Sequence, residues 1–112
     1  MGALKRSIRS AVLVMAAVGS FGAAAGASPQ PATHHVKMEA TGFSPPTLTV
    51  KAGDRVVWTN QDPFPHTATA KGVFDSRTVA PGKTWTYRAT KRGEFDYLCT
   101  LHPIMKGKLI VK

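Results

Sequence analysis

The feature that most limits the fold of this chain is the way glycine and proline divide it into short extended runs. No segment after residue 35 keeps a helical period of apolar residues, because turn-forming residues interrupt each run. The runs are rich in β-branched and aromatic residues, which favour strands. The candidate strands are residues 36–43, 48–50, 56–59, 66–70, 77–79, 84–87, 94–99 and 108–112. This pattern predicts an all-β sandwich or barrel of seven to eight strands.

The first 27 residues have the composition of a secretory signal peptide. Three basic residues precede the apolar run 11–18, and small residues follow it up to Ala27. The apolar run is too short to cross a bilayer, which favours a cleaved leader, although an uncleaved N-terminal anchor is the alternative. We therefore expect a periplasmic protein without a membrane anchor. Its signal peptide is residues 1–27 and its single domain is residues 28–112, of which 28–33 form a flexible lead-in.

The charge of the exported part limits its partners. Twelve of the 15 Lys and Arg residues follow residue 27, where all six Asp and Glu residues also lie, so residues 28–112 carry a net charge of +6. Such a charge keeps a small protein soluble and can steer it toward an acidic partner. The longest basic run is Lys91-Arg92, so nucleic acid is not an expected partner. We expect a monomer.

Cys99 is the only cysteine in the chain, and its isolation requires an explanation. It cannot form an intrachain disulfide, and an exposed free thiol outside the cytoplasm would be open to oxidation. Burial or metal ligation would protect it, and the histidine and methionine that follow in sequence favour ligation.

Cys99, His102 and Met105 are spaced three residues apart, which places a thiolate, an imidazole and a thioether in one short loop. His66, which follows the stiff segment Pro63-Phe64-Pro65, is the candidate second imidazole. One thiolate, two imidazoles and a weak axial methionine describe a trigonal copper site. Zinc sites rarely include a thioether. The sequence therefore predicts one copper ion per chain, bound by these four residues.

Each donor also has an ordinary explanation when it is taken alone. A methionine at a strand start packs in a core, a histidine in a proline-rich turn is solvated, and a buried cysteine is inert. It is their combined spacing that favours the metal site. The two remaining histidines, His34 and His35, precede the first strand and form either a flexible, solvated pair or an auxiliary metal site.

The chain resembles the cupredoxins and, within that family, the amicyanins. The resemblance covers nearly all of residues 28–112, through segments 43–46 and 50–60, the Pro65-His66 pair and the loop 99–105. The loop Cys-x-x-His-x-x-Met is as short as that of amicyanins, whereas plastocyanins and pseudoazurins have a longer gap between histidine and methionine. The resemblance implies a Greek-key β-sandwich with one type 1 (blue) copper. Its implied ligands are His66, Cys99, His102 and Met105.

Three further residues are singled out beside these ligands. By resemblance, Asn60 bridges the two ligand loops through a hydrogen bond to Thr100, although an ordinary turn asparagine is the alternative. Leu101 stands where amicyanins and plastocyanins usually have proline, so the chain carries an additional backbone N–H two residues after Cys99. This amide either raises the reduction potential by pointing at the sulfur, or the leucine side chain only enlarges an apolar surface.

The function implied by the resemblance is that of a diffusible electron carrier, not an enzyme. Single electrons would pass through His102 to redox partners such as a dehydrogenase, a reductase or a cytochrome, which dock transiently. Lys71 and Lys106 would attract an acidic partner. The residues expected to form an apolar collar around His102 are Phe64, Pro65, Leu101, Pro103 and Ile104.

Two other classes of function are set against the carrier. A copper-delivery or resistance protein would need tracts rich in methionine or histidine, but residues 28–112 contain only Met38 and Met105. A copper oxidase or reductase would need histidines for a second copper centre, and only His34 and His35 are left for it.

Overall fold

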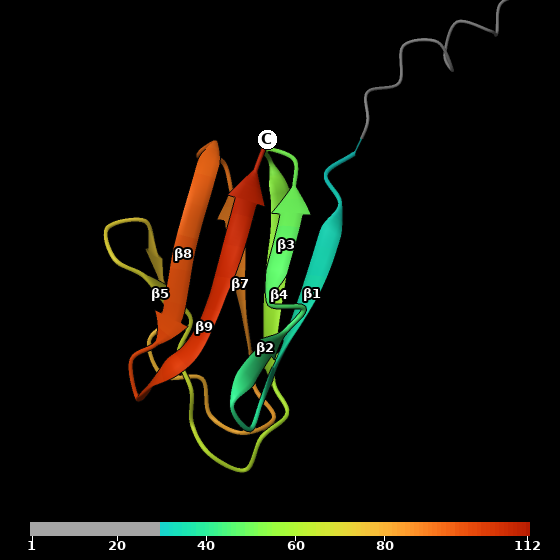
Figure 1. Ribbon diagram of the computed structural model, residues 1–112. Helices are drawn as coiled ribbons and strands as arrows, with labels where there is room; N and C mark the ends of the chain where they lie inside the picture. The colour runs from blue at the N-terminus through green and yellow to red at the C-terminus, as the bar shows by residue number, and fades with distance from the viewer. Residues whose placement is uncertain (1–29) are drawn as a thin grey trace, which may run out of the picture.

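The computed structural model describes residues 30–112, which form two β-sheets packed face to face and include no α-helix (Figure 1). The predicted signal peptide lies outside these residues. Within them there is no helix long and apolar enough to span a membrane. The strands are β1 (Thr33–Glu39), β2 (Gly42–Ser44), β3 (Thr47–Val50), β4 (Asp54–Asn60), β5 (Thr69–Ala70), β6 (Phe74–Asp75), β7 (Thr84–Ala89), β8 (Gly93–Cys99) and β9 (His102–Val111).

Both sheets are mixed. The four-stranded sheet has the order β2-β1-β4-β7, and the five-stranded sheet has the order β3-β9-β8-β5-β6. Strands β1 and β4 are parallel, as are β3 and β9, whereas the other neighbours are antiparallel. The chain changes sheets between β3 and β4, so these consecutive strands lie in opposite layers. The predicted all-β sandwich is confirmed, with nine strands among the described residues instead of seven to eight.

Several predicted strand boundaries are wrong. The run 36–43 is two antiparallel strands, β1 and β2, because the chain reverses at Ala40, whose φ of 34° is not compatible with a strand. Strand β1 begins at Thr33, inside the predicted flexible lead-in. The run 66–70 contributes only the short β5, and the run 77–79 contributes a single bridge between His66 and Val79. Strand β6 was not predicted.

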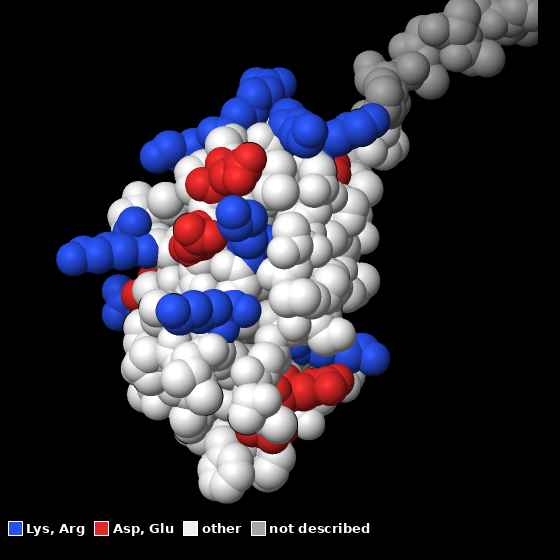
Figure 2. Space-filling model, in the orientation of Figure 1, with Lys and Arg blue, Asp and Glu red and all other residues white. Residues whose placement is uncertain are grey.

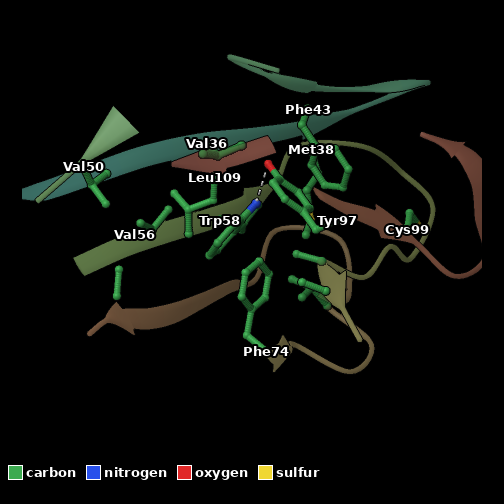
Figure 3. Close-up of a cluster of buried hydrophobic side chains, with 14 of the residues drawn as sticks. Val36, Met38, Phe43, Val50, Val56, Trp58, Phe74, Tyr97, Cys99 and Leu109 are labelled. Atoms are coloured by element: carbon green, nitrogen blue, oxygen red, sulfur yellow. Dashed lines mark hydrogen bonds between the residues drawn. The ribbon is translucent and has the colours of Figure 1, made fainter. Parts of the chain in front are cut away.

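Trp58 lies at the centre of the core between the sheets (Figure 3). Its side chain is completely buried, and its indole N–H donates a hydrogen bond to the Tyr97 hydroxyl at 3.2 Å. The Tyr97 ring also meets Phe43 edge-on, with 4.6 Å between ring centroids. Trp58 comes from β4, Tyr97 from β8 and Phe43 from β2, so these contacts join the two sheets. Burial raises the pKa of Tyr97 to about 12, which keeps its hydroxyl protonated at any physiological pH.

The elements that carry the predicted metal donors reach the same end of the sandwich. Strand β8 ends at Cys99, β9 begins at His102, and the segment after β4 leads to His66. Figure 1 shows these connections at the end opposite the C-terminus. Cys99 and His102 stand at the ends of paired strands, and His66 is paired with Val79 in an isolated bridge, so backbone hydrogen bonds hold all three donors.

Candidate metal centre

Three of the predicted donors converge. One ligand atom each from His66, Cys99 and His102 lies within 4.8 Å of the others. The Cys99 sulfur is 3.6 Å from Nδ1 of His66 and 3.8 Å from Nδ1 of His102. His66 is 33 positions from Cys99 in sequence, yet the fold brings its imidazole together with the Cys99 sulfur and the His102 imidazole at one point.

Backbone hydrogen bonds hold both the loop that carries Cys99 and His102 and the loop that carries His66. Cys99 and His102 face each other in register at the turn between β8 and β9. His66 exchanges backbone hydrogen bonds with Val79, at 3.2 Å from its N–H and 2.8 Å to its carbonyl. His66 and Cys99 are completely buried, whereas His102 is exposed. One imidazole is thus enclosed by protein and the other reaches the surface.

Met105 is completely buried on β9, three residues after His102. It belongs to the same core cluster as Cys99. This position agrees with the predicted fourth donor but also with core packing, so its role as a ligand stays a prediction.

The ring of His66 is oriented by Asp62, a residue that the sequence analysis missed. Nε2 of His66 lies 2.7 Å from the Asp62 carboxylate, which accepts its proton and turns Nδ1 toward the sulfur of Cys99. Burial of the ring lowers the pKa of His66, but the hydrogen bonds to Asp62 and Cys99 outweigh burial and raise it. The hydrogen bond from His66 lowers the pKa of Asp62. The sequence already contained a hint of this contact, because Asp62 stands four residues before His66.

The surroundings of Cys99 lower the pKa of its thiol. Its burial raises the pKa, yet hydrogen bonds from the Thr67 amide, from the two site imidazoles and from the Leu101 amide together lower the pKa to about 6. The Thr67 N–H donates to the sulfur at 3.3 Å. Leu101 makes the smallest of these stabilising contributions. The thiolate is the form that binds metals, so the site favours its ligating state at neutral pH.

The prediction that Asn60 bonds to Thr100 is wrong. The Asn60 amide instead donates to the carbonyls of Phe64, at 2.8 Å, and Val79, at 2.9 Å. Its side-chain oxygen accepts the Asp62 N–H at 2.8 Å. Asn60 therefore pairs buried backbone groups of the His66 loop that would otherwise have no partner.

Thr67, which sequence reasoning missed, bridges the two ligand loops in place of Asn60. Its hydroxyl accepts the Thr100 N–H at 2.9 Å and lies 3.2 Å from the Thr100 hydroxyl. No local feature of the sequence identified this contact, because it joins residues 33 positions apart.

Exposed apolar side chains adjoin the two histidine donors in sequence, and the rings of His66 and His102 lie 5.0 Å apart between centroids. Phe64 is 62% exposed, Leu101 49% and Ile104 79%. These are the exposed large apolar residues of the described chain, and with the exposed Pro65 and Pro103 they are the residues of the collar that the sequence analysis predicts. Such a concentration of apolar surface is typical of a contact site for another molecule.

The histidines near the start of β1 are not part of this cluster. His34 lies 2.9 Å from the buried Asp54 carboxylate, so its Nε2 is engaged by the fold. In residues 30–112 the one group of three possible metal donors is His66, Cys99 and His102. The structure thus gives no support to an auxiliary metal site at His34 and His35.

The donor set fits copper by its chemistry. A thiolate suits Cu(I), imidazole suits both oxidation states, and a nearby buried thioether is a soft donor that copper accepts and zinc seldom uses. Structural zinc sites are closed tetrahedra of Cys and His, whereas only three such donors meet here.

Comparison with known proteins agrees with this interpretation. The sequence matches the family described as a cupredoxin-like domain over residues 10–111. Amicyanin-alpha of Methylorubrum extorquens is 35% identical over 83 residues, which cover 69% of this chain and 70% of that protein. Amicyanin of Paracoccus versutus is 34% identical over 83 residues, covering 69% and 63%. Chloroplast plastocyanin of Tetradesmus obliquus is 39% identical over 84 residues, covering 62% of this chain and 58% of that protein.

Solved structures show the same likeness. An oxidised mutant of amicyanin superimposes with a TM-score of 0.66 at 29% identity, over 70% of this chain and 81% of that one. A purple cupredoxin from Nitrosopumilus maritimus gives a TM-score of 0.65 at 23% identity, over 70% of this chain and 99% of that one. At that identity the second comparison supports the fold alone.

Proposed function

The chain belongs to the cupredoxin-like family, and from this membership we propose that it is a periplasmic electron carrier with one type 1 copper. Cupredoxins bind one copper ion, and the His-Cys-His group required for it is present. The observation that carries the proposal is the convergence of His66, Cys99 and His102, whose ligand atoms lie within 4.8 Å of one another.

In this proposal Nδ1 of His66, the sulfur of Cys99 and Nδ1 of His102 hold the ion, and the Met105 thioether is the weak fourth donor. The bound copper would supply the ability to take up and release one electron. One thiolate and two imidazoles suit both oxidation states, so neither state requires a different set of residues.

The chain's own contribution is rigidity. Asp62 fixes the His66 ring, the β8–β9 register fixes Cys99 opposite His102, and Thr67 ties the two ligand loops together. Donors that are held in place before the electron arrives need little rearrangement when the charge changes, which favours fast transfer.

The exposed ring of His102 is the proposed point of electron exchange. The collar of Phe64, Pro65, Leu101, Pro103 and Ile104 would give it an exposed apolar surround, which suits a small and short-lived contact. We expect partners that are themselves redox proteins, such as a dehydrogenase, a reductase or a cytochrome, and a carrier that works as a monomer. Export by residues 1–27 would place it in the periplasm.

A metal-binding experiment tests this function. Residues 28–112, titrated with Cu(II), should bind one equivalent and develop the intense thiolate-to-copper charge-transfer band of a blue site. Cys99→Ala should abolish the band while circular dichroism shows an unchanged β-fold.

The matched control is His35→Ala, which removes an exposed histidine outside the cluster and should leave the band intact. A Cys99 variant that keeps the band would contradict the ligand assignment. Colourless binding of several copper ions would favour the copper-delivery alternative instead.

A further inference from the structure

Positively charged side chains gather at the end of the sandwich opposite the donor cluster. Here the starts of β4 and β8 meet the ends of β3, β7 and β9, with Asp54 in register with Ala89 and Gly93 in register with Val111. Figure 2 shows blue side chains gathered at this end, at the top of the view. The residues that we call the basic end are all exposed: Lys51, Arg55, Arg88, Lys91 and Arg92.

These charges are not neutralised by the fold. Among residues 30–112, no carboxylate lies within 4.0 Å of any of the five side chains. Asp54 is buried, and its oxygens accept hydrogen bonds from groups inside the fold. Glu94 lies 3.5 Å from the ammonium group of Lys108, which offsets its charge. Five cations and the Asp54 carboxylate leave this end with a net charge of about +4, a field that attracts anions.

Two of the cations are placed against each other. Arg55 on β4 and Arg88 on β7 are directly opposite in register. Their neighbours Asp54 and Ala89 are buried, so both arginines project from the outer face of the four-stranded sheet. Like charges directly opposite in a sheet are destabilising. A phosphate between the two guanidinium groups would relieve this repulsion and accept hydrogen bonds from both.

The basic end is too broad for a single phosphate. Arg55 and Arg88 belong to the four-stranded sheet, whereas Lys51, Lys91 and Arg92 lie in the two turns that cross to the five-stranded sheet. Packed sheets are about 10 Å apart, so the charges extend across the whole end of the sandwich. A bilayer with anionic headgroups presents many phosphates in one plane, which suits this distribution.

The point where the chain enters the fold favours a membrane over an acidic protein. The Arg55 N–H donates to the Ala32 carbonyl at 2.9 Å, and Thr33 begins β1 in register with Arg55. Between Ala32 and Ala27, the last residue of the predicted signal peptide, the chain can span at most about 18 Å. While that leader is in the membrane, the basic end would therefore be held close to the lipid headgroups.

We propose that the basic end binds anionic phospholipid headgroups reversibly, with the His102 end directed away from the membrane. The contact is electrostatic, because the exposed large apolar side chains Phe64, Leu101 and Ile104 belong to the collar and not to the basic end. The consequence is that the collar stays open to redox partners while the protein moves along the membrane. That consequence rests on the proposed carrier function, whereas the lipid contact itself does not require copper.

Vesicle binding tests the proposal. Residues 28–112, copper-loaded or metal-free, are mixed with vesicles of equimolar phosphatidylglycerol and phosphatidylcholine, and sedimentation measures the bound fraction. We expect both forms to bind at low salt, to be released as salt is added, and not to bind vesicles of phosphatidylcholine alone. The metal-free arm needs no copper, so a failure of the blue-site assignment would not remove this result.

A lipid whose headgroup carries a gadolinium chelate measures the orientation. It broadens the amide signals of nearby residues in the ¹⁵N-labelled, metal-free protein. We expect broadening at residues 51–55 and 88–92, and none at residues 101–104 at the other end of the sandwich.

Charge variants identify the cause. Arg55→Gln with Arg88→Gln should weaken vesicle binding about 25-fold, because each charge near an anionic surface contributes about 5-fold, or ~1 kcal/mol. These two arginines repel each other, so their replacement should leave the protein folded, which circular dichroism checks.

The matched control is Lys37→Gln with Lys83→Gln, which lowers the net charge by the same amount. Both lysines are exposed and lie toward the donor end of the four-stranded sheet, since Lys37 is in register with Thr59 and the Lys83 carbonyl accepts the Asn60 N–H. This variant should bind vesicles nearly as well as the natural protein.

Four outcomes would overturn the proposal. Equal weakening by the two double substitutions would show that only net charge is recognised. Broadening centred on the collar would place the contact at the opposite end. Tighter binding to soluble polyglutamate than to the vesicles, at matched charge, would favour an acidic protein as the partner. The fourth is the absence of binding at low salt.

Discussion

The sulfur of Cys99 is the single group whose acidity the fold alters most. In the metal-free protein its thiol is expected to titrate with a pKa of about 6, because the hydrogen bonds from Thr67, His66, His102 and Leu101 outweigh the cost of burial. A free cysteine titrates near pKa ~8.5. Ultraviolet absorbance of the thiolate, followed against pH, measures the difference.

The same titration of the denatured chain is the control, since unfolding removes every one of these hydrogen bonds. Its midpoint should return to the ordinary value. Coincidence of the folded and denatured curves would show that the site does not stabilise the thiolate, and metal binding would then require a proton to be displaced at neutral pH.

The backbone N–H of Leu101 is expected to raise the reduction potential of the copper-loaded protein. A hydrogen bond to the sulfur withdraws electron density, weakens its donation to Cu(II) and so favours Cu(I). Leu101→Pro should therefore lower the potential by tens of millivolts. A shift of ~60 mV is about 1.4 kcal/mol for one electron, which is the net size of one hydrogen bond. The Leu101 amide contributes least among the groups that stabilise the thiolate, so we expect a shift below that value.

Voltammetry of Leu101→Ala separates the amide from the side chain. Alanine keeps the N–H and removes most of the exposed apolar surface, so its potential should stay near that of the natural protein. If alanine and proline shift the potential equally, the side chain and not the amide is responsible.

The sequence was sufficient for donors that are close in sequence, but not for contacts between distant segments. Cys99 and His102 were found from their spacing, and His66 from its proline-rich setting. The partner of Thr100 was misassigned to Asn60, because which of two polar residues faces it depends on how the His66 loop folds over Val79. That arrangement is tertiary and has no local signature.

At the scale of elements, the β8–β9 pair supports both the site and the core, and Gly107 is its most constrained position. A Cβ at Gly107 would lie 2.4 Å from Cζ and 2.6 Å from the hydroxyl oxygen of Tyr97. The Tyr97 ring is held between Phe43 and Trp58 and has little room to move. Gly107→Ala should therefore destabilise the protein by about 1–3 kcal/mol, the usual cost of overpacking. Urea unfolding of the metal-free protein measures it.

Gly42→Ala is the matched control, because it also replaces a strand glycine but its Cβ would have no atom within 4 Å. Its free energy of unfolding should stay within about 0.5 kcal/mol of the natural protein. Equal effects of the two substitutions would point to backbone conformation rather than to the Tyr97 contact.

Strand existence was predicted well and strand pairing was not. The runs 48–50, 56–59, 84–87 and 94–99 all lie within observed strands, since β-branched and aromatic residues alternate there. The parallel pairs β1–β4 and β3–β9 join segments that are distant in sequence, and a hydrophobic pattern does not specify its partner. The short β5 pairs with β8 through Thr69 and Leu98, and β6 pairs with β5, so both strands depend on tertiary contacts.

At the scale of the whole molecule, the two ends of the sandwich have separate tasks. The end with the Cys99 loop carries the metal donors and the apolar collar. The opposite end, where β4 begins, carries Asp54, a buried carboxylate that joins the start of β1 to the turn between β3 and β4. It accepts hydrogen bonds from the backbone N–H of Ala32 at 3.0 Å, the N–H of Lys51 at 3.0 Å, and Nε2 of His34 at 2.9 Å. A substitution of Asp54 is therefore expected to change stability without touching the metal donors.

Asp54 is accordingly expected to determine part of the acid stability of the fold. The hydrogen bond from His34, followed by those from Lys51 and Ala32, lowers the pKa of Asp54 from 3.8 to about 2. Between these values the unfolded chain binds more protons than the folded one, so the free energy of unfolding falls as the pH falls. The contribution of Asp54 is complete above pH 4 and is lost as the pH falls through about 2.

Urea unfolding of the metal-free protein at a series of pH values tests this expectation without interference from metal release. The natural protein should exceed Asp54→Asn in stability at pH 5, and the difference should shrink steadily between pH 4 and pH 2. In a His34→Gln background the stability difference between the proteins with and without Asp54→Asn should be smaller, because the substitution of His34 deletes the largest cause of the lowered pKa of Asp54. Asp62→Asn, measured in the same way, gives the separate contribution of the other hydrogen-bonded carboxylate, which lies at the metal end. A stability difference between the natural protein and Asp54→Asn that does not change down to pH 2 would show that the carboxylate acts only as a neutral hydrogen-bond acceptor.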